Sequence, residues 1–472
     1  RLMRNDGTVF TDVTTASGIY NSVLGYGLGI SVTDFNNDGW DDIYVGNDFH
    51  ENDYYYVNQK NGSFLEMSAA AFGHSSQFSM GNDAADINND GWMDLMTLDM
   101  LPADEKVLKT SVGDQSLDIY YQQRLMGYNY QYARNSLQLN TGSGKRFSDI
   151  ALYSGVAATD WSWSSLIADY DHDGYNDIFI SNGIKRRLND LDYLKFISST
   201  SLRENVNTTR DFDKSMLEKM PGGKWHNYMW KGSDSLMFSD KSTDWGFENA
   251  DLSNGTAYAD LDNDGDLDII INHVDAKAGI YKNNLLRSDS SNFLKIKFEG
   301  ENKNKFGIGN KVFVFAGNKM HYQLLQPCRG FLSSSEPVLN FGLGTADKID
   351  SIIIIWTDNK LQVIRNIPAN QLLSIKNRDT KDTVADQQTY ISHLLKSDTK
   401  KVFEDITSKT GVDFVHRENL SYFDFNSQAF IPHKISTTGP HVTVADINGD
   451  GLDDFYACGA KNQPGKLYVQ TK

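Results

Sequence analysis

The chain has 472 residues, of which 39% are hydrophobic and 12% aromatic, and its formal net charge is −17. This length exceeds one ordinary domain, and the apolar content is high enough for packed cores, which argues against a disordered chain. The acidic balance disfavours nucleic acid and anionic membrane surfaces as partners, because both attract basic proteins.

A short acidic motif occurs five times, beginning at residues 34, 86, 169, 260 and 446. Oxygen-bearing side chains occupy its first, third, fifth and ninth positions, and a glycine that permits a sharp turn occupies the sixth. Side chains at alternate positions of a tight loop point inward together, and Ca²⁺ takes roughly six to eight oxygen ligands. The seventh residue would contribute its backbone carbonyl, so its side chain is free to vary. The motif therefore predicts about five Ca²⁺ ions, one in each loop.

The predicted ligands are Asp34, Asn36, Asp38, Trp40 and Asp42 in loop 1; Asp86, Asn88, Asp90, Trp92 and Asp94 in loop 2; Asp169, Asp171, Asp173, Tyr175 and Asp177 in loop 3; Asp260, Asp262, Asp264, Asp266 and Asp268 in loop 4; and Asp446, Asn448, Asp450, Leu452 and Asp454 in loop 5.

Strands, rather than helices, are predicted to follow these loops. Apolar residues alternate after them, as at Ile43 and Val45, and this period of two is typical of a strand. An EF-hand would carry Glu at position 12, where this chain has Val45, Thr97, Ile180, Ile271 and Ala457. A single Asp/Asn/Gly cluster is usually only a turn, but five copies with one spacing favour calcium over Mg²⁺. We expect the ions to stabilise the fold.

The repeated unit is larger than the loop. A strand pattern with an Asn, a Gly and a Phe precedes the loops, first at Asn5, Gly7 and Phe10. The 52-residue spacing between the loop starts at 34 and 86 suits one four-stranded blade. Longer spacings indicate insertions, and we predict helical ones at residues 101–134 and 184–225. They would cap one propeller face and line a binding surface.

The repeats resemble FG-GAP/VCBS repeats, the integrin-α type of propeller blade. A later segment with Gly330-Phe331, Phe341-Gly-Leu-Gly344 and Ile352–Trp356 resembles the ASPIC/UnbV domain of proteins similar to the cartilage acidic protein family. The resemblance implies an all-β fold: β-propeller blades plus a small β-rich domain. The predicted order is propeller blades over 1–290, an ASPIC/UnbV-like domain over 291–377, a linker over 378–400, and the start of a further propeller over 401–472.

The arrangement of the last segment leaves two interpretations. Four loops precede the ASPIC/UnbV-like domain, fewer than the roughly six to eight blades of a closed ring. One blade is not stable alone, because each repeat buries its face against its neighbours. We favour a second propeller that begins at 401, in a chain that is part of a longer protein; the alternative is that residues 401–472 complete the first ring. Cys328 and Cys458 fall in different predicted domains, so we expect no disulfide.

Two classes of function are compatible with the sequence. We favour a non-catalytic, calcium-stabilised scaffold that is extracellular or at the cell surface (the outer-membrane surface in a bacterium) and binds a protein or glycan. Weak calcium sites fill in extracellular calcium rather than at cytosolic levels, and the family resemblance implies the same location. No apolar run approaches the roughly 20 residues of a membrane-spanning helix, so membrane attachment would need a lipid anchor or a membrane-complex partner.

The alternative is a polysaccharide-active enzyme, a lyase or hydrolase, that uses a propeller cleft. The sequence contains neither a His-Glu-x-x-His nor a Gly-x-Ser-x-Gly motif. We therefore predict no catalytic residues and no organic cofactor. His172 and His273 are interpreted as loop or surface residues. Trp161 and Trp163 are interpreted as core packing, with a carbohydrate-stacking platform as the alternative, and Asn47, Asn182 and Asn272 as strand-ending residues.

Overall fold

The computed structural model describes all residues except 21, 113–116, 199–215, 286–290, 302, 396–402, 419–421, 433 and 472. Parts of both predicted insertions, the end of the predicted linker and the first residues of the predicted further propeller therefore lie outside the described residues. The chain divides into two compact units, Arg1–Lys396 and Ser397–Lys472. Among the described helices, none is long and apolar enough to cross a membrane.

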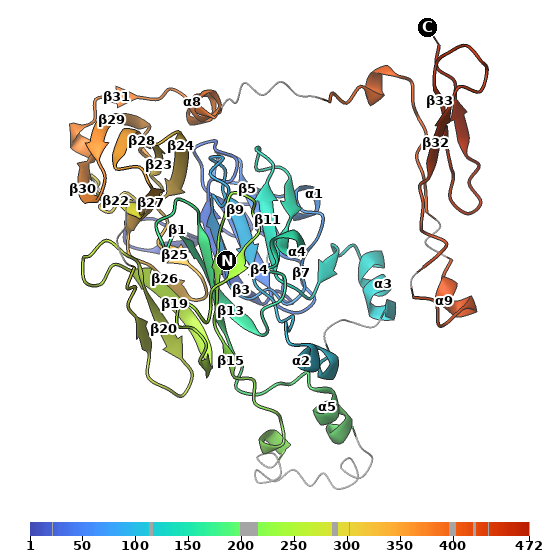
Figure 1. Ribbon diagram of the computed structural model, residues 1–472, viewed down its shortest axis with the longest axis horizontal. Coiled ribbons are helices and arrows are strands. Elements are labelled where there is room, and N and C mark those ends of the chain that lie inside the picture. Colours follow the sequence, from blue (N-terminus) through green and yellow to red (C-terminus); the bar gives the residue numbers. More distant parts are fainter. Residues whose placement is uncertain are drawn as a thin grey trace. The chain divides into compact units, whose positions relative to one another are not determined.

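Four antiparallel sheets of the first unit are the propeller blades (Figure 1). Their innermost strands contact one another in order: β3 contacts β8, β8 contacts β13, and β13 contacts β19. From the inside outward, blade 1 contains β3 (Gly27–Thr33), β4 (Asp42–Asn47), β5 (Tyr54–Asn58) and β6 (Phe64–Glu66); blade 2 contains β8 (Asn82–Ala85), β9 (Asp94–Thr97), β11 (Ser136–Asn140) and β12 (Phe147–Asp149); blade 3 contains β13 (Ser162–Ala168), β14 (Asp177–Asn182), β16 (Tyr228–Lys231) and β17 (Ser239–Asp240); and blade 4 contains β19 (Ser253–Ala259), β20 (Asp268–His273) and β21 (Gly279–Tyr281). The predicted all-β fold is confirmed.

Shorter pairs of strands complete the blade region. They are β1 (Met3–Asn5) with β2 (Phe10–Asp12), β7 (Ser75–Ser76) with β10 (Gln131–Tyr132), and β15 (Trp225–His226) with β18 (Ala250–Asp251). Two one-turn helices, α1 (Ser68–Ala71) and α4 (Ala151–Ser154), follow the outermost strands of blades 1 and 2. They lead the chain from the outside of one blade toward the inner strand of the next.

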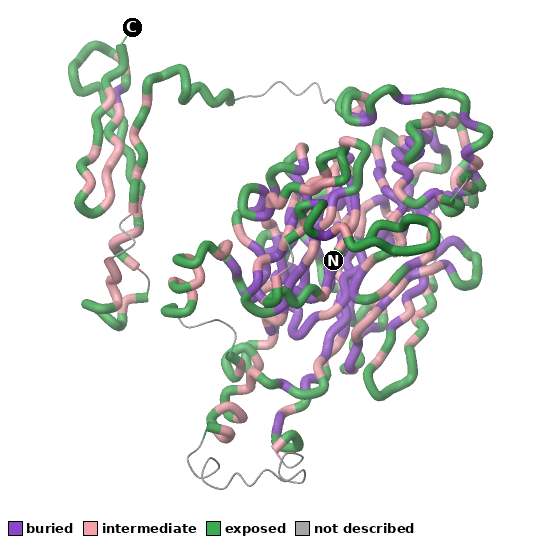
Figure 2. The backbone as a smooth tube through the Cα atoms, turned by 180° about the vertical axis from the view of Figure 1, so that it is seen from behind, coloured by how far each residue is buried: buried purple, intermediate pink, exposed green. Residues whose placement is uncertain are grey.

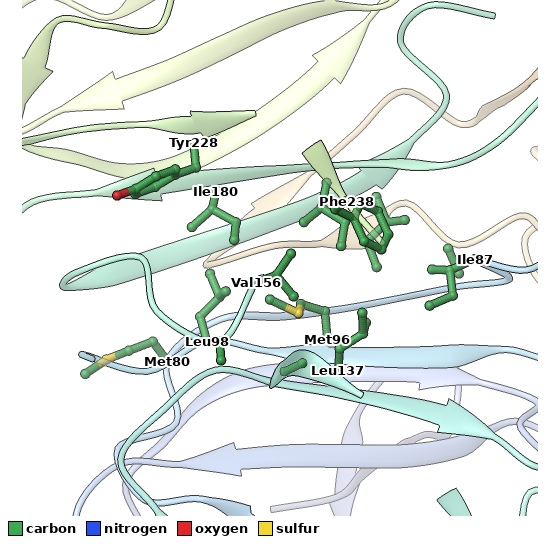
Figure 3. Packing of buried hydrophobic residues seen from close by; sticks show 14 of the residues in the cluster. Met80, Ile87, Met96, Leu98, Leu137, Val156, Ile180, Tyr228 and Phe238 are labelled. Carbon is green, nitrogen blue, oxygen red and sulfur yellow. The ribbon is translucent and has the colours of Figure 1, made fainter. Parts of the chain in front are cut away.

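The hydrophobic core lies between neighbouring blades. On β13, Leu166 packs with Phe179 in one buried cluster, whereas the adjacent Ile167 belongs to the cluster that faces blade 2. Successive strand residues point to opposite faces, so one strand serves two interfaces. Figure 3 shows Ile180 of blade 3 close to Leu98 and the other blade 2 side chains of that second cluster.

Three helices confirm the predicted helical insertions: α2 (Glu105–Thr110), α3 (Leu117–Leu125) and α5 (Leu191–Ile197). The side chains of Asp104 and Asp190 cap α2 and α5 by accepting the N–H groups of Val107 and Tyr193. A β-bridge from Ser111 to Asp190 joins the two insertions. In Figure 1, α2 and α5 project from the blades on the side away from β22–β31.

Residues 292–395, called the module below, form two larger sheets and a two-stranded hairpin. The first is β27 (Val338–Gly344), β22 (Asn292–Glu299) and β30 (Gln371–Lys376); the second is β24 (Lys319–Leu324), β23 (Lys311–Ala316), β28 (Lys348–Ile355), β29 (Lys360–Pro368) and β31 (Asp382–Thr383). A 3-10 turn at Asn377–Asp379 and helix α8 (Gln387–Leu394) follow the last long strand. Ile352 and Ile354 of β28, and Trp356 directly after it, lie in the module core. The module shares one compact unit with the blades.

A hairpin of the module reaches the inner strands of the blades. Residues 325–336, called the axial hairpin, contain β25 (Cys328–Arg329) and β26 (Ser333–Ser334). β25 contacts β3 and β8, and β26 contacts β19. Phe331 packs on Trp163 with ring centroids 5.1 Å apart, and Trp161 is 8% exposed. Both tryptophans thus pack in the interior, as interpreted from the sequence.

The second unit contains one sheet of three antiparallel strands, β32 (Val442–Ala445), β33 (Asp454–Ala457) and β34 (Lys466–Tyr468). Loop 5 joins β32 to β33, just as loops 1–4 join the first two strands of their blades. A 3-10 turn at Thr407–Lys409 and α9 (Asp424–Ser427) precede the sheet. Figure 2 shows most of this unit as exposed. Cys328 and Cys458 are both free thiols.

Candidate metal centres

All five loops fold around their first aspartate with the same hydrogen bonds. In loop 1, Asp34 Oδ1 accepts the N–H of Asp38 at 3.0 Å, and Asp34 Oδ2 accepts the N–H of Gly39 at 2.6 Å. Asp38 Oδ1 accepts the N–H of Trp40 at 3.0 Å. The same three bonds are formed around Asp86, Asp169, Asp260 and Asp446. The shared spacing in the sequence is therefore a shared backbone geometry.

The ninth aspartate links each loop to the end of the third strand of its sheet or to the one or two residues that follow that strand. Asp42 Oδ2 accepts the N–H of Phe35, and Asp42 Oδ1 accepts the N–H of Asn58. Asp94, Asp177, Asp268 and Asp454 form the equivalent two bonds. These carboxylates are buried, and burial raises the pKa of Asp42 to about 8 and that of Asp94 well above its usual range. A cation beside them would favour the charged form.

In loops 3 and 4, three of the predicted ligand carboxylates converge. Carboxylate oxygens of Asp169, Asp171 and Asp177 lie within 4.8 Å of one another, and so do those of Asp260, Asp262 and Asp264. Asp171 Oδ1 is buried and accepts no hydrogen bond among the described residues. The conserved set within each loop consists of oxygen donors, without the thiolate and imidazole ligands of a zinc site. The residues therefore fit Ca²⁺, and the first, third, fifth and ninth side chains of each loop would hold it.

Two positions in every loop have a left-handed backbone. The sequence revealed the sixth-position glycines, whose φ angles run from 81° to 99°. The left-handed backbone at the fourth position was not expected from the sequence, although that position holds Asn in three loops and Gly in one, and both residues favour this conformation. The fourth residues, with φ angles between 55° and 75°, are Asn37, Asn89, His172, Asn263 and Gly449.

Side chains at the fourth position connect neighbouring loops. Asn37 Nδ2 donates to the carbonyl of Gly91 at 2.9 Å, which joins loop 1 to loop 2. Asn89 Nδ2 donates to the carbonyl of Gly174, also at 2.9 Å, which joins loop 2 to loop 3. At loop 4, Asn340 of the module provides the corresponding donor to the carbonyl of Gly265. The loops thus stabilise the blade interfaces and the contact with the module.

His172 lies in loop 3, as interpreted, but not at the surface. Its side chain is fully buried, because the imidazole stacks on Phe293 of the module with ring centroids 5.5 Å apart. Its Nδ1 lies 3.6 Å from Asp266 Oδ1 of loop 4. His273 ends β20 beside the hydroxyl of Ser253, 3.2 Å from its Nδ1.

The asparagines interpreted as strand-ending residues are placed as follows. Asn47 ends β4 and donates to the carbonyl of Asn52 at 2.7 Å. Asn182 ends β14 and donates to the carbonyl of His226 at 3.0 Å. Asn272 is exposed and lies one residue before the end of β20. The first two therefore bind neighbouring backbone, as expected.

We predict that Gly265→Ala destabilises the first unit more than Gly155→Ala does. Both glycines have a left-handed φ, +99° and +81°. A Cβ at Gly265 would lie 2.4 Å from the ring of Phe293, whereas nothing lies within 4 Å of a Cβ at Gly155. We expect a cost of about 1–2 kcal/mol for Gly155→Ala from backbone strain alone, and about 1–3 kcal/mol more for Gly265→Ala from overpacking. Urea unfolding of both variants measures the difference; equal costs would contradict the close contact.

Two buried lysines of the module bind the loops, and neither was expected from the sequence. Lys311 Nζ of β23 lies 2.5 Å from Asp34 Oδ2, and Lys295 Nζ of β22 lies 2.5 Å from Asp260 Oδ2. In each case this is the oxygen that already accepts the N–H of the sixth-position glycine. The lysines therefore orient the first aspartates, in the manner of outer-shell partners that position metal ligands.

Family comparisons match both parts of the first unit. The FG-GAP-like repeat family matches residues 34–97, which hold loops 1 and 2. The family described as ASPIC and UnbV matches residues 300–382, which lie in the module. A solved structure titled "Structural basis of specific recognition of non-reducing terminal N-acetylglucosamine by an Agrocybe aegerita lection" shares 15% identity and covers 61% of each chain, with a TM-score of 0.26. A TM-score this low does not show that the two proteins share a fold.

Curated relatives match most of this chain. Cartilage acidic protein 1 of Mus musculus is 25% identical over 373 residues, 77% of this chain and 46% of the relative. The Homo sapiens protein is 25% identical over 377 residues, 77% of this chain and 45% of the relative. The chain spans about half the length of these curated relatives. Parts of the chain thus match FG-GAP-like repeats and the ASPIC and UnbV family, and the chain is homologous to cartilage acidic protein 1.

Proposed function

We propose that the chain is a calcium-stabilised, non-catalytic scaffold, secreted or exposed at the cell surface, that binds a protein or glycan partner. The observation that carries the proposal is the arrangement of carboxylates repeated in all five loops, in each of which the ninth aspartate is buried. Four of these loops belong to successive blades of the first unit, and side-chain bonds join loop 1 to loop 2 and loop 2 to loop 3. An ion in each loop would therefore act on the blade interfaces.

The role of the metal is electrostatic. The first, fifth and ninth positions are aspartate in every loop, and loops 3 and 4 add a third-position aspartate. In loops 1–3, desolvation and mutual repulsion of these carboxylates disfavour their charged forms, as in the raised pKa of Asp86, which burial and then the charge of Asp90 bring to about 8. A bound Ca²⁺ would supply the opposite charge. The chain's own residues supply the ligands and the bonds that hold them.

Homology supports the location and the absence of catalysis. FG-GAP-like repeats and the likeness to cartilage acidic protein 1 favour a non-enzymatic extracellular repeat protein. Extracellular calcium is high enough to fill weak sites of this kind. The insertion helices α2, α3 and α5 extend the surface away from the module and are the first candidates for partner contacts, since insertions in repeat proteins often line the binding face.

We predict that the full chain binds about five Ca²⁺ ions, and that Asp94→Asn binds one fewer. Asp94 closes loop 2 from a fully buried position, and an amide there offers one neutral oxygen in place of a carboxylate. Equilibrium dialysis followed by metal analysis gives the count. Asp275→Asn is the matched control, because Asp275 is an exposed aspartate outside the loops that pairs with Lys185. Wild-type protein without bound calcium would contradict the proposal.

The partner is tested separately. A glycan array and a pull-down from extracts of the native cell surface, both with calcium present, should identify a protein or glycan that remains bound. Chelation of calcium should abolish the binding if the partner contacts blades that calcium stabilises. Turnover of a polysaccharide by the purified chain would instead favour a lyase or hydrolase.

A further inference from the structure

Two loops contain a lysine at the place where a metal ion would bind. In loop 3, Lys231 Nζ lies 2.5 Å from Asp173 Oδ2 and also contacts Asp171 Oδ2. In loop 4, Lys282 Nζ contacts Asp262 Oδ2 and lies 3.8 Å from Asp264 Oδ2. Both lysines thus touch the third and fifth aspartates, which are two of the predicted metal ligands of their loop.

The two lysines occupy equivalent positions in their blades. Lys231 precedes Gly232, whose N–H binds the ninth aspartate of loop 3, and Lys282 precedes Asn283, whose N–H binds the ninth aspartate of loop 4. Loops 1, 2 and 5 have apolar residues at this position: Val57, Leu139 and Val469. A lysine at this position therefore distinguishes loops 3 and 4 from the other three. Loop 1 has ammonium contacts from other positions: Lys60 Nζ lies 3.4 Å from Asp38 Oδ2, and Lys311 contacts Asp34.

Loops 2 and 5 have a neutral donor instead. Asn88 Nδ2 donates to Asp90 Oδ2 at 2.9 Å, and Asn448 Nδ2 donates to Asp450 Oδ2 at 3.0 Å. Both donors are third-position ligands, so rotation of the amide by half a turn exchanges the nitrogen for an oxygen that can bind the metal. A lysine, by contrast, cannot become a ligand and must leave, because an ammonium group has no acceptor.

We propose that calcium enters loops 3 and 4 by displacing Lys231 and Lys282, so that these loops bind it more weakly than loop 2. The inference rests on the proposed calcium function. Each lysine compensates the loop carboxylates when the metal is absent, which keeps blades 3 and 4 folded at low calcium. Charge-assisted hydrogen bonds are the strong ones, and breaking them opposes metal binding. Loop 2, without an ammonium contact among the described residues, fills before loops 3 and 4 as calcium rises.

The test is a calcium titration of the full chain by isothermal calorimetry. We expect Lys231→Met and Lys282→Met each to raise the calcium affinity of one loop by about tenfold, which corresponds to 1.4 kcal/mol. Lys185→Met is the matched control, because Lys185 forms an exposed pair with Asp275 outside the loops. It should leave every affinity unchanged.

A second measurement assigns the change to a loop. Terbium is a luminescent calcium substitute that nearby aromatic rings sensitise, and the seventh residue is Trp92 in loop 2 and Tyr175 in loop 3. In Lys231→Met, tyrosine-sensitised terbium emission should saturate at lower metal concentration, while tryptophan-sensitised emission should not move. If both methionine variants fold and their calcium affinity is unchanged or weaker, this inference is overturned but the proposed function is not. A wild-type chain that takes up no calcium would overturn the proposed function as well.

Discussion

Removing calcium with EGTA should lower the unfolding temperature of the first unit by about 8 °C. At about 2 mM free calcium and a Kd of about 0.1 mM, each site contributes about 1.8 kcal/mol to the free energy of unfolding. Four loops therefore contribute roughly 7 kcal/mol. A unit of 396 residues unfolds with an entropy of about 0.8 kcal/mol/K, which converts this contribution into the stated shift. Differential scanning calorimetry with and without chelator measures it.

Two controls test whether the shift is specific to calcium bound in the loops. Restoring calcium should recover the original unfolding temperature, whereas an equal concentration of Mg²⁺ should recover little, because Mg²⁺ demands octahedral geometry and keeps its waters. Asp94→Asn should lose at least a quarter of the calcium-dependent shift, since it removes one of four sites in the unit and loops 3 and 4 are inferred to bind calcium more weakly than loop 2. An unfolding temperature that chelation leaves unchanged would show that the loops do not need the ion for stability.

The loops could be predicted from the sequence because their information is local. Nine consecutive residues contain the ligands and the sixth-position glycine, and the alternation after each loop indicates the strand that follows. The fourth-position asparagines, such as Asn37 and Asn89, recur at a constant place and could have been found by the same comparison of the repeats. Their role as links between loops needed the structure, because the acceptor is in the next blade.

The long-range contacts could not be predicted in this way. Lys311 lies 277 residues from Asp34, and nothing in the strand that contains it indicates a calcium loop as its partner. A lysine in a strand is ordinarily a solvent-exposed residue, whereas Lys311 is 2% exposed. The axial hairpin is a similar case. Its Gly330-Phe331 pair resembled part of the ASPIC/UnbV domain, but only the fold places Phe331 on Trp163 of blade 3.

Arg329→Met is expected to destabilise the first unit by about 3–5 kcal/mol, the usual cost of leaving one member of a buried ion pair without its partner. Arg329 extends from the axial hairpin, and its Nε donates to Asp83 Oδ1 of blade 2 at 2.8 Å. Its other nitrogens donate to the hydroxyl of Tyr258 in blade 4 at 2.6 Å and to the carbonyl of Ala84 at 2.9 Å. Three bonds from one guanidinium thus join two blades that are not neighbours. Urea unfolding monitored by tryptophan fluorescence measures the loss.

The role of Arg329 as a connection between blades is distinguished from simple packing by a double-mutant cycle with Asp83→Asn. Asp83 Oδ2 also accepts the N–H of Ile167 in blade 3 at 2.8 Å, and an asparagine can keep that bond through its amide oxygen. If the uncompensated charge dominates the cost, Arg329→Met combined with Asp83→Asn should be more stable than Arg329→Met alone. Additive losses would instead indicate that the arginine acts through its contacts with Tyr258 and Ala84. Either way, a loss no larger than that of the exposed-pair variant Lys185→Met would mean that the hairpin does not hold the blades together.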